Sequence, residues 1–273
     1  MKQYPMYDPI LEHESCGVGA VADLTGAATH QTVSDALTIV ERLAHRAGCD
    51  ALGTTGDGVG ILTQIPHRVF ARWAAAEGIE LGEVRDYGVG MFFAPEGCTQ
   101  AVVRRAVAAA AEKENLRILG WRNVPCHPEI LGEGARRTMP DIFQCFIARP
   151  EDCARGLEFD RRLYVLRRAF EKAGTGAYAC SLSSRTIVYK GMMLVTQLRT
   201  FYDDLHDVDY TSAIAMVHSR FSTNTEPSWR KAHPHRMLMH NGEINTIRGN
   251  ADRMFAREET MRSAALDGKL EKL

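Results

Sequence analysis

Short apolar runs recur along the chain, and their spacing predicts β-strands. Residues 87–94 alternate between two sides and are rich in aromatic and β-branched types, as a strand requires. Residues 59–65 form a second apolar run, which stops at Pro66. Only three residues separate the runs 177–182 and 186–190, so these two predict consecutive strands.

Other segments have the three-to-four-residue apolar spacing of an amphipathic helix. Residues 31–45 place Val33, Leu37 and Val40 on one side, and residues 99–113 are rich in alanine. The full set of predicted helices is 31–45, 67–76, 99–113, 159–173 and 253–265. The full set of predicted strands is 17–22, 59–65, 87–94, 116–124, 142–148, 177–182, 186–190, 214–218 and 237–240. Because the strands come in runs and pairs rather than in strict alternation with helices, they predict an α+β architecture.

Composition narrows the class of protein. A chain of 273 residues, 45% hydrophobic and 25% charged, is ordinary for a globular domain with a sizeable core. Its formal net charge of −1 gives no reason to expect a nucleic acid or an acidic membrane as partner. No apolar stretch reaches the roughly 18 residues that a membrane span needs, and residues 1–15 lack the apolar core of a signal peptide.

The cysteine pattern indicates the compartment. There are seven cysteines, an odd number, and no two have the Cys-x-x-Cys spacing of a zinc ribbon. A disulfide framework is therefore not expected, and reduced thiols predict a cytoplasmic protein.

Cys16 is the first candidate for chemistry, because it stands directly before the glycine-rich start of a predicted strand. A buried structural cysteine is the ordinary interpretation of such a residue. However, residues 1–15 are polar and carry no clear element, which suits a removable leader. Cleavage before Cys16 would free its α-amino group, whose reference pKa of about 7.7–8.0 lets it accept the thiol proton. One residue would then supply both nucleophile and base.

The second candidate group lies more than 200 residues further on. The Asn241 side-chain amide and the Gly242 backbone N–H could stabilise an oxyanion, although Asn-Gly is also the commonest signal for a hairpin turn. Arg220 could bind a substrate carboxylate through two hydrogen bonds, with Thr223 donating a hydroxyl beside it. The ordinary alternatives are that Arg220 forms a surface salt bridge and that Thr223 is simply a threonine at the end of a strand. His218 and His240 stand on separate predicted strands without an evident third ligand, so a metal site is not expected.

Residues 54–62 contain three glycines in five positions, which invites comparison with a phosphate-binding loop. The spacing fits neither the Rossmann nor the Walker pattern. A tight loop leading into the strand at 59–65 is the better interpretation.

Taken together, these stretches resemble the class II glutamine amidotransferases, and among them the amidotransferase domain of the glutamate synthase large chain. The resemblance covers nearly the whole chain and is very specific in order and spacing. The matching stretches are 7–9, 12–13, 16–19, 45–67 (HRAGCDALGTTGDGVGILTQIPH), 118–125, 181–193, 197–205, 218–229 (HSRFSTNTEPSW) and 240–250 (HNGEINTIRGN).

The resemblance implies a four-layer αββα sandwich of the N-terminal-nucleophile hydrolase type, with a leader at 1–15 and the amidotransferase domain at 16–273. It implies that Cys16 attacks the amide of L-glutamine, that Asn241 and Gly242 form the oxyanion hole, and that Arg220 and Thr223 hold the substrate α-carboxylate. No cofactor or metal is implied in this domain. Flavin mononucleotide and an iron–sulfur cluster are implied in the synthase domains or partner subunit, which would use the ammonia to aminate 2-oxoglutarate.

Two departures from the family pattern stand out. The family usually reads His-Arg-Gly-Ala where this chain has His45, Arg46, Ala47 and Gly48. A Ser-Asp-Ser segment whose aspartate contacts the substrate amine is expected after Leu273, so we expect the domain to be incomplete at its C-terminal end. Two alternatives therefore remain open: an amidotransferase subunit of a related split system, such as an N-methylglutamate synthase, and a non-catalytic regulatory module with the same fold.

Overall fold

The computed structural model describes residues 17–219, 226–236, 247–266 and 269. In this part of the chain, strands form two four-stranded sheets with antiparallel pairing throughout. The order of the first sheet is β1 (Val18–Ala22), β8 (Ile214–His218), β2 (Val59–Gln64) and β7 (Thr186–Gly191). The order of the second sheet is β4 (Ile118–Asn123), β5 (Asp141–Ala148), β3 (Tyr87–Ala94) and β6 (Tyr178–Ser183).

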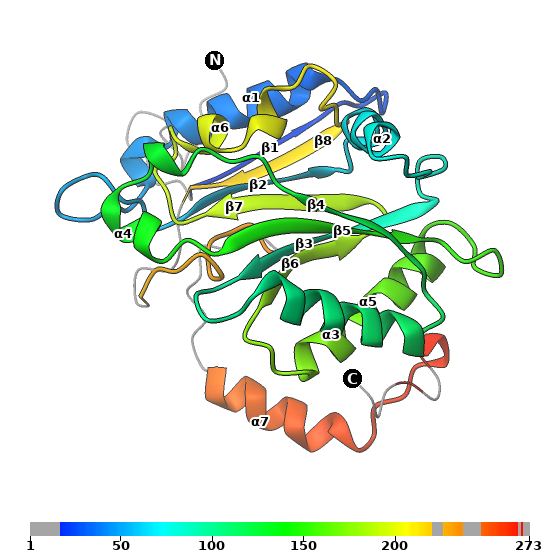
Figure 1. Cartoon of the computed structure of the whole chain (residues 1–273). Coiled ribbons are helices and arrows are strands. Elements are labelled where there is room, and N and C mark those ends of the chain that lie inside the picture. Colours follow the sequence, from blue (N-terminus) through cyan, green and yellow to red (C-terminus); the bar gives the residue numbers. More distant parts are fainter. Residues whose placement is uncertain (1–16, 220–225, 237–246, 267–268, 270–273) are drawn as a thin grey trace, which may run out of the picture.

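Helices cover the outer side of each sheet (Figure 1). The first sheet lies under α1 (His30–Arg42) and α6 (Leu198–Phe201), and the second lies against α3 (Gln100–Lys113) and α5 (Leu157–Lys172). The layers thus follow the order helix, sheet, sheet, helix. The predicted α+β class and the four-layer sandwich are confirmed.

The remaining elements lie at the ends or on the outside of these layers. They are α2 (His67–Ala76), α4 (Glu133–Arg137), α7 (Ile247–Glu258) and the 3₁₀ turns Ala44–Arg46, Pro128–Ile130, Asp203–His206 and Ala264–Leu266. Among the described residues, no helix combines the length and the apolar composition that crossing a bilayer would require.

Burial explains why β3 reads as a nearly continuous apolar run. Its alternate residues Tyr87, Val89, Met91 and Phe93 belong to the core shared with the first sheet and α1. Phe92 and Ala94 point the other way, into the core under α3 and α5. A strand buried on both faces has no polar side to show in the sequence.

Side-chain caps fix where two predicted helices begin. The Thr29 hydroxyl accepts a hydrogen bond from the Thr32 backbone N–H at the start of α1, and Thr99 accepts one from Val102 at the start of α3. These bonds satisfy backbone donors that the first helical turn leaves unpaired. The helix predicted at 31–45 is shorter at its C-terminal end, because residues 44–46 turn into a 3₁₀ helix.

One predicted helix is wrong in position. The sequence predicts a helix over 253–265, whereas α7 spans Ile247–Glu258 and lies beyond the α3 and α5 layer (Figure 1). No residue of α7 is buried, and Ile247, Met254 and Phe255 are exposed. Because α7 does not pack against other elements, its sequence has no apolar stripe from which its bounds could be predicted. The strand predicted at 237–240 lies outside the described residues.

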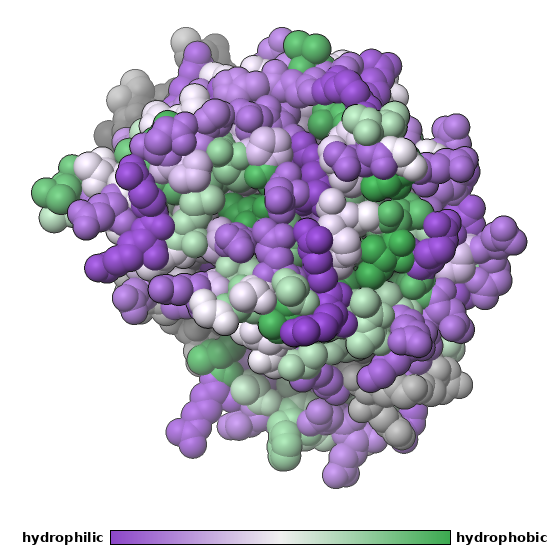
Figure 2. Space-filling model, viewed as in Figure 1, coloured by the Kyte–Doolittle hydropathy of each residue, from purple (hydrophilic) through white to green (hydrophobic). Residues whose placement is uncertain are grey.

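A buried polar group, which we call the Arg122 network, lies inside the sandwich. Arg122 donates two hydrogen bonds to the Asp204 carboxylate at 2.8 and 2.6 Å and a third to Gln144 at 2.9 Å. The Tyr189 hydroxyl donates to Asp204 at 2.6 Å and accepts from the Gln144 amide at 3.0 Å. The network joins β4, β5 and β7 to the turn at Asp203–His206, and its cation faces a carboxylate. Most other hydrophilic side chains lie on the surface, as Figure 2 shows for the face in view.

Candidate functional site

The sequence-predicted site residues lie outside the described part of the chain. This holds for Cys16, Arg220, Thr223, Asn241 and Gly242. The structure does describe the residues next to these gaps, namely Gly17, Ser219, Glu226, Arg236 and Ile247. The surroundings of the site are therefore built from its neighbours.

The start of β1 and the end of β8 meet at one end of the first sheet. The two strands are antiparallel, with Val18 opposite His218, and the Ser219 N–H donates to the Gly17 carbonyl at 2.7 Å. A Cβ added at Gly17 would overlap the Ser219 hydroxyl in its present position, so the absence of a side chain lets the two residues lie close together. Gly17 directly follows the candidate Cys16, and Ser219 directly precedes the candidate Arg220. Gly17 and Ser219, about 200 positions apart in the sequence, are therefore neighbours here.

Next to this junction, residues 229–236 cross the sheet on the face that carries His218 and Lys190; we call them the 229–236 loop. A Cβ added at Gly60, in β2 between those two side chains, would lie 2.5 Å from the His233 carbonyl oxygen and 2.5 Å from the Lys190 Cβ. The bare backbone of Gly60 therefore makes room for the loop on the sheet.

Lys190 holds this loop from below. Its side chain is fully buried, and its ammonium donates to the Arg230 carbonyl at 2.9 Å and to the Ala232 carbonyl at 2.7 Å. His235 Nδ1 lies 3.3 Å from the same nitrogen, and the Tyr178 hydroxyl lies 3.4 Å away. We call these groups the Lys190 cluster.

Both ends of the loop are also fixed. The Trp229 indole donates to the Ala135 carbonyl at 3.1 Å and packs where Gly191 has no side chain. Arg236 donates to the Ala179 carbonyl and pairs with Glu171 at 2.9 Å. The loop is thus held in place up to the last residue before the next candidate segment.

Positive charge gathers around one ring of the cluster. The Lys190 ammonium and the Arg230 and Arg236 guanidinium groups lie 4.9, 5.2 and 5.1 Å from the centre of the Tyr178 ring. Burial, with the nearby Arg236 and Arg230 cations, lowers the pKa of Lys190 to about 8. Burial, with Lys190 and Arg236, lowers the pKa of His235 to about 4. A neutral His235 can accept a hydrogen bond from the ammonium.

Three imidazole rings extend from the cluster towards the junction. The ring centres of His218 and His233 are 4.8 Å apart, and those of His233 and His235 are 4.2 Å apart. Within the described residues, no three His, Cys, Asp or Glu side chains form a group that could hold a metal ion.

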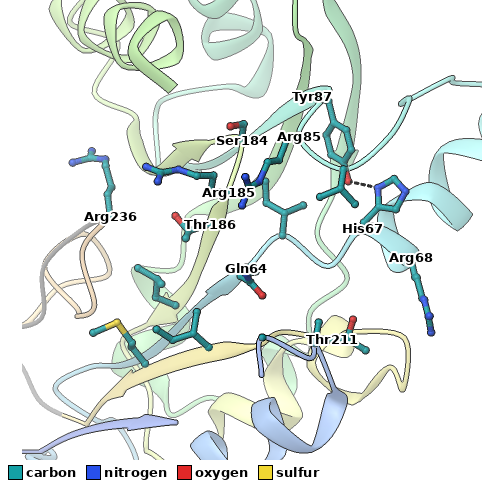
Figure 3. Close-up of a pocket in the computed structure, with 17 residues that line it drawn as sticks. Gln64, His67, Arg68, Arg85, Tyr87, Ser184, Arg185, Thr186, Thr211 and Arg236 are labelled. Carbon is teal, nitrogen blue, oxygen red and sulfur yellow. Dashed lines mark hydrogen bonds between the residues drawn. The ribbon is translucent and has the colours of Figure 1, made fainter. Parts of the chain in front are cut away.

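A hollow of about 760 Å³ lies along the same face of the first sheet. Leu62, Met216 and Ile214 line its base, and Arg236 stands at the end nearest the Lys190 cluster. Figure 3 shows Arg85, Arg185 and Thr186 around the hollow, with the His67 ring bonded to the Tyr87 hydroxyl at 3.0 Å. The cavity therefore adjoins the end of the 229–236 loop at Arg236.

The glycine-rich stretch forms a tight loop leading into β2, as predicted. The Asp50 carboxylate accepts from the backbone N–H groups of Thr54 and Thr55, and Cys49 bridges to Gly56. At Gly48, where the resembling family usually has alanine, an added Cβ would overlap the Asp57 carboxylate. Glycine in place of alanine at position 48 thus leaves room for the Asp57 carboxylate to lie against the backbone of residue 48.

Sequence reasoning missed Lys190, His233, His235 and Gly60. The only signal in the sequence is a lysine at the end of an apolar strand, which usually marks the surface. Its burial depends on a loop about 40 positions further along the chain.

Comparison with known proteins agrees with this arrangement. The family model for class-II glutamine amidotransferases matches residues 16–273. The glutamate synthase [NADPH] large chain of Bacillus subtilis is 42% identical over the whole of this chain, which covers 18% of that protein. The ferredoxin-dependent glutamate synthase 2 of Synechocystis is 44% identical over 92% of this chain and 16% of its own length. The glutamate synthase [NADH] of Schizosaccharomyces pombe is 40% identical over 96% of this chain and 13% of its own.

The chain spans less than a fifth of the length of each of these relatives. It corresponds to their amidotransferase portion alone. From the family match, these identities and the two antiparallel sheets between helices, the chain belongs to the class II glutamine amidotransferases and is homologous to glutamate synthases.

Proposed function

We propose that this domain hydrolyses the side-chain amide of L-glutamine through a thioester on Cys16. The observation that carries the proposal is the junction at which Gly17 and Ser219 are bonded, because it joins the strand after Cys16 to the strand before Arg220. The family match supports it, since it begins at residue 16.

In this mechanism, removal of residues 1–15 frees the α-amine of Cys16, which accepts the thiol proton. The thiolate attacks the amide carbon, and the Asn241 amide and Gly242 N–H stabilise the oxyanion. Ammonia leaves with the transferred proton, and water then hydrolyses the thioester to release glutamate. Arg220 and Thr223 hold the substrate carboxylate.

The surroundings suit an anionic intermediate. Lys190, Arg230 and Arg236 stand around Tyr178 on the sheet face that also carries His218. Cations near a site where negative charge develops stabilise that charge. The sheet face that carries His218 therefore has a positive potential.

We infer further that the ammonia serves reductive amination of 2-oxoglutarate in a glutamate synthase. The names of the relatives support glutamate as the product. On this proposal, flavin mononucleotide and an iron–sulfur cluster belong to the synthase domains or partner. Product analysis with synthase subunits decides between glutamate and N-methylglutamate.

The test combines mass spectrometry with an ammonia assay. The purified chain should contain a species that begins at Cys16, and Cys16→Ala should abolish ammonia release from glutamine. A chain that keeps residues 1–15 while remaining active would rule out the α-amine as base. Equal ammonia release from the wild type and Cys16→Ala would leave a non-catalytic module as the better interpretation.

A second variant tests the oxyanion hole. Asn241→Ala should lower kcat by roughly 10²–10³, because one oxyanion donor is lost. The far-UV circular dichroism spectrum should remain that of the wild type. A loss below about fivefold would mean that Asn241 only shapes a turn.

A further inference from the structure

The 229–236 loop is the last described segment before the one that carries Asn241 and Gly242. Several contacts set its position, and three of them converge on one nitrogen. The Lys190 ammonium has three protons, and it meets the carbonyl oxygens of Arg230 and Ala232 and the Nδ1 atom of His235. The three protons thus serve these three nearest acceptors when Lys190 is charged and His235 is neutral, while the Tyr178 hydroxyl lies further away, at 3.4 Å.

We propose that Lys190 is a positioning residue for glutamine hydrolysis, which holds the 229–236 loop on the sheet beside His218 and so fixes the entry to the Asn241-Gly242 segment. The inference rests on the proposed function. It assigns a role to a side chain that does not itself bind glutamine.

Lys190 is a side chain of the first sheet that hydrogen-bonds the backbone in the middle of this loop. Below it, β2 presents only the Gly60 backbone, against which the His233 carbonyl lies. A hydrogen bond to the Ala135 carbonyl holds Trp229 at one end, and an ion pair holds Arg236 at the other. Between these ends the ammonium bonds the carbonyl oxygens of Arg230 and Ala232, and a loss of these bonds would let the middle of the loop shift. Displacements of about 1 Å near reacting groups can lower rates about 10²-fold.

Three titratable groups that face Lys190, namely Tyr178, Cys180 and His235, do not change charge around pH 8. Burial raises the pKa of both Tyr178 and Cys180 to about 12, so both stay neutral. The lowered pKa of His235 keeps that ring neutral above about pH 4. As the pH rises past about 8, Lys190 loses a proton, and one of its acceptors loses its donor.

The main experiment measures glutamine hydrolysis by Lys190→Met, which keeps a long side chain but removes all three donors. We expect kcat per folded molecule to fall roughly 10–100-fold, with KM changed less. Arg122→Met is the matched control, because Arg122 is also a buried cation but bonds to the opposite face of β7 through Tyr189 and Asp204. It should lower thermal stability and leave kcat per folded molecule within about twofold.

A pH profile separates positioning from simple structural support. The wild-type kcat should decline above about pH 8 as Lys190 loses its proton. Lys190→Arg keeps its charge throughout that range, so its profile should lack this decline. The same alkaline decline in both proteins would overturn the role of the ammonium.

Gly60→Ala reaches the same loop from the sheet side. Its new methyl group would press on the His233 carbonyl, so kcat should fall about tenfold or more even if Lys190→Met does not fold. Gly88→Ala is its control: the added Cβ would lie 2.5 Å from a Leu163 methyl, in the core under α5. It should alter stability alone.

The outcomes are distinct. An active wild type with Lys190→Met and Gly60→Ala both losing less than tenfold would overturn this inference and leave the proposed function intact. A wild type no faster than Cys16→Ala would remove the proposed function, and this inference with it.

Discussion

Two buried cations, Arg122 and Lys190, bond to opposite faces of the same strand. On one face of β7, Tyr189 joins Arg122 to the Asp204 carboxylate. On the other face, the neighbouring residue Lys190 bonds to two carbonyl oxygens and an imidazole, and no carboxylate contacts it within the described chain. Both side chains are at least nine-tenths buried.

The difference lies in how each charge is compensated. A bidentate carboxylate keeps Arg122 charged, and the Arg122 network joins elements of the core permanently. Lys190 has only dipoles for partners, so burial lowers its pKa and its bonds depend on pH. We infer that the first arrangement stabilises the sandwich, while the second positions a loop. Variants of the two groups test whether the Arg122 network stabilises the fold and the Lys190 cluster positions the loop.

The largest effect is expected from Asp204→Ala. It leaves the Arg122 guanidinium buried without its carboxylate, which typically destabilises a protein by about 3–5 kcal/mol. Urea denaturation should show this loss, while kcat per folded molecule stays near wild type. The exposed pair of Asp152 with Arg162 is the control, because Asp152→Ala there should change stability by less than about 1 kcal/mol.

The two tyrosines of these groups give the next comparison. Tyr189→Phe removes a buried hydroxyl that both donates and accepts, so we expect a loss of about 1–3 kcal/mol in unfolding free energy. Tyr178→Phe removes a hydroxyl whose bond to Lys190 is long, at 3.4 Å, and should lose about 1 kcal/mol or less. A larger loss for Tyr178→Phe would contradict the assignment of stability to the Arg122 network.

The smallest effect is expected in the dependence of stability on acid pH, through His235. His235 has a pKa of about 4 in the folded chain, below its ordinary 6.5. Between these values the unfolded chain binds more protons, so this group's contribution to stability is lost as the pH falls from about 6.5 towards 4. Urea midpoints measured across that range should fall less steeply for His235→Gln than for the wild type. Parallel curves would show that His235 does not titrate between these limits.

The sequence predicted most of the fold because most elements are marked by packing. The helix at 67–76 and the strands at 87–94 and 214–218 have the predicted bounds, since apolar residues fill them and breaks such as Pro66 delimit them. The helices α4 and α6 were missed because five and four residues are too few to show a period. For α7, exposure on all sides removed the apolar pattern on which a prediction depends.

For the site, the sequence indicated the reacting groups but not their support. Cys16, Arg220 and Asn241 were recognised through the motifs around them, and their roles stay predictions. Lys190 was not recognised, because its surroundings are created by Arg230, Ala232 and His235, which approach it only after folding. A single sequence does not show which distant carbonyl oxygens a lysine will meet.

Gly60 has a consequence for how this domain can vary. Because the loop lies against main-chain atoms of β2, its height above the sheet is fixed by peptide geometry, which is the same for every sequence. Core side chains beneath α3, away from Glu171 and Ala179, which hold Arg236 at the end of the loop, are then free to drift during evolution without shifting the loop. We expect engineered repacking of that layer to alter melting temperature while leaving turnover unchanged.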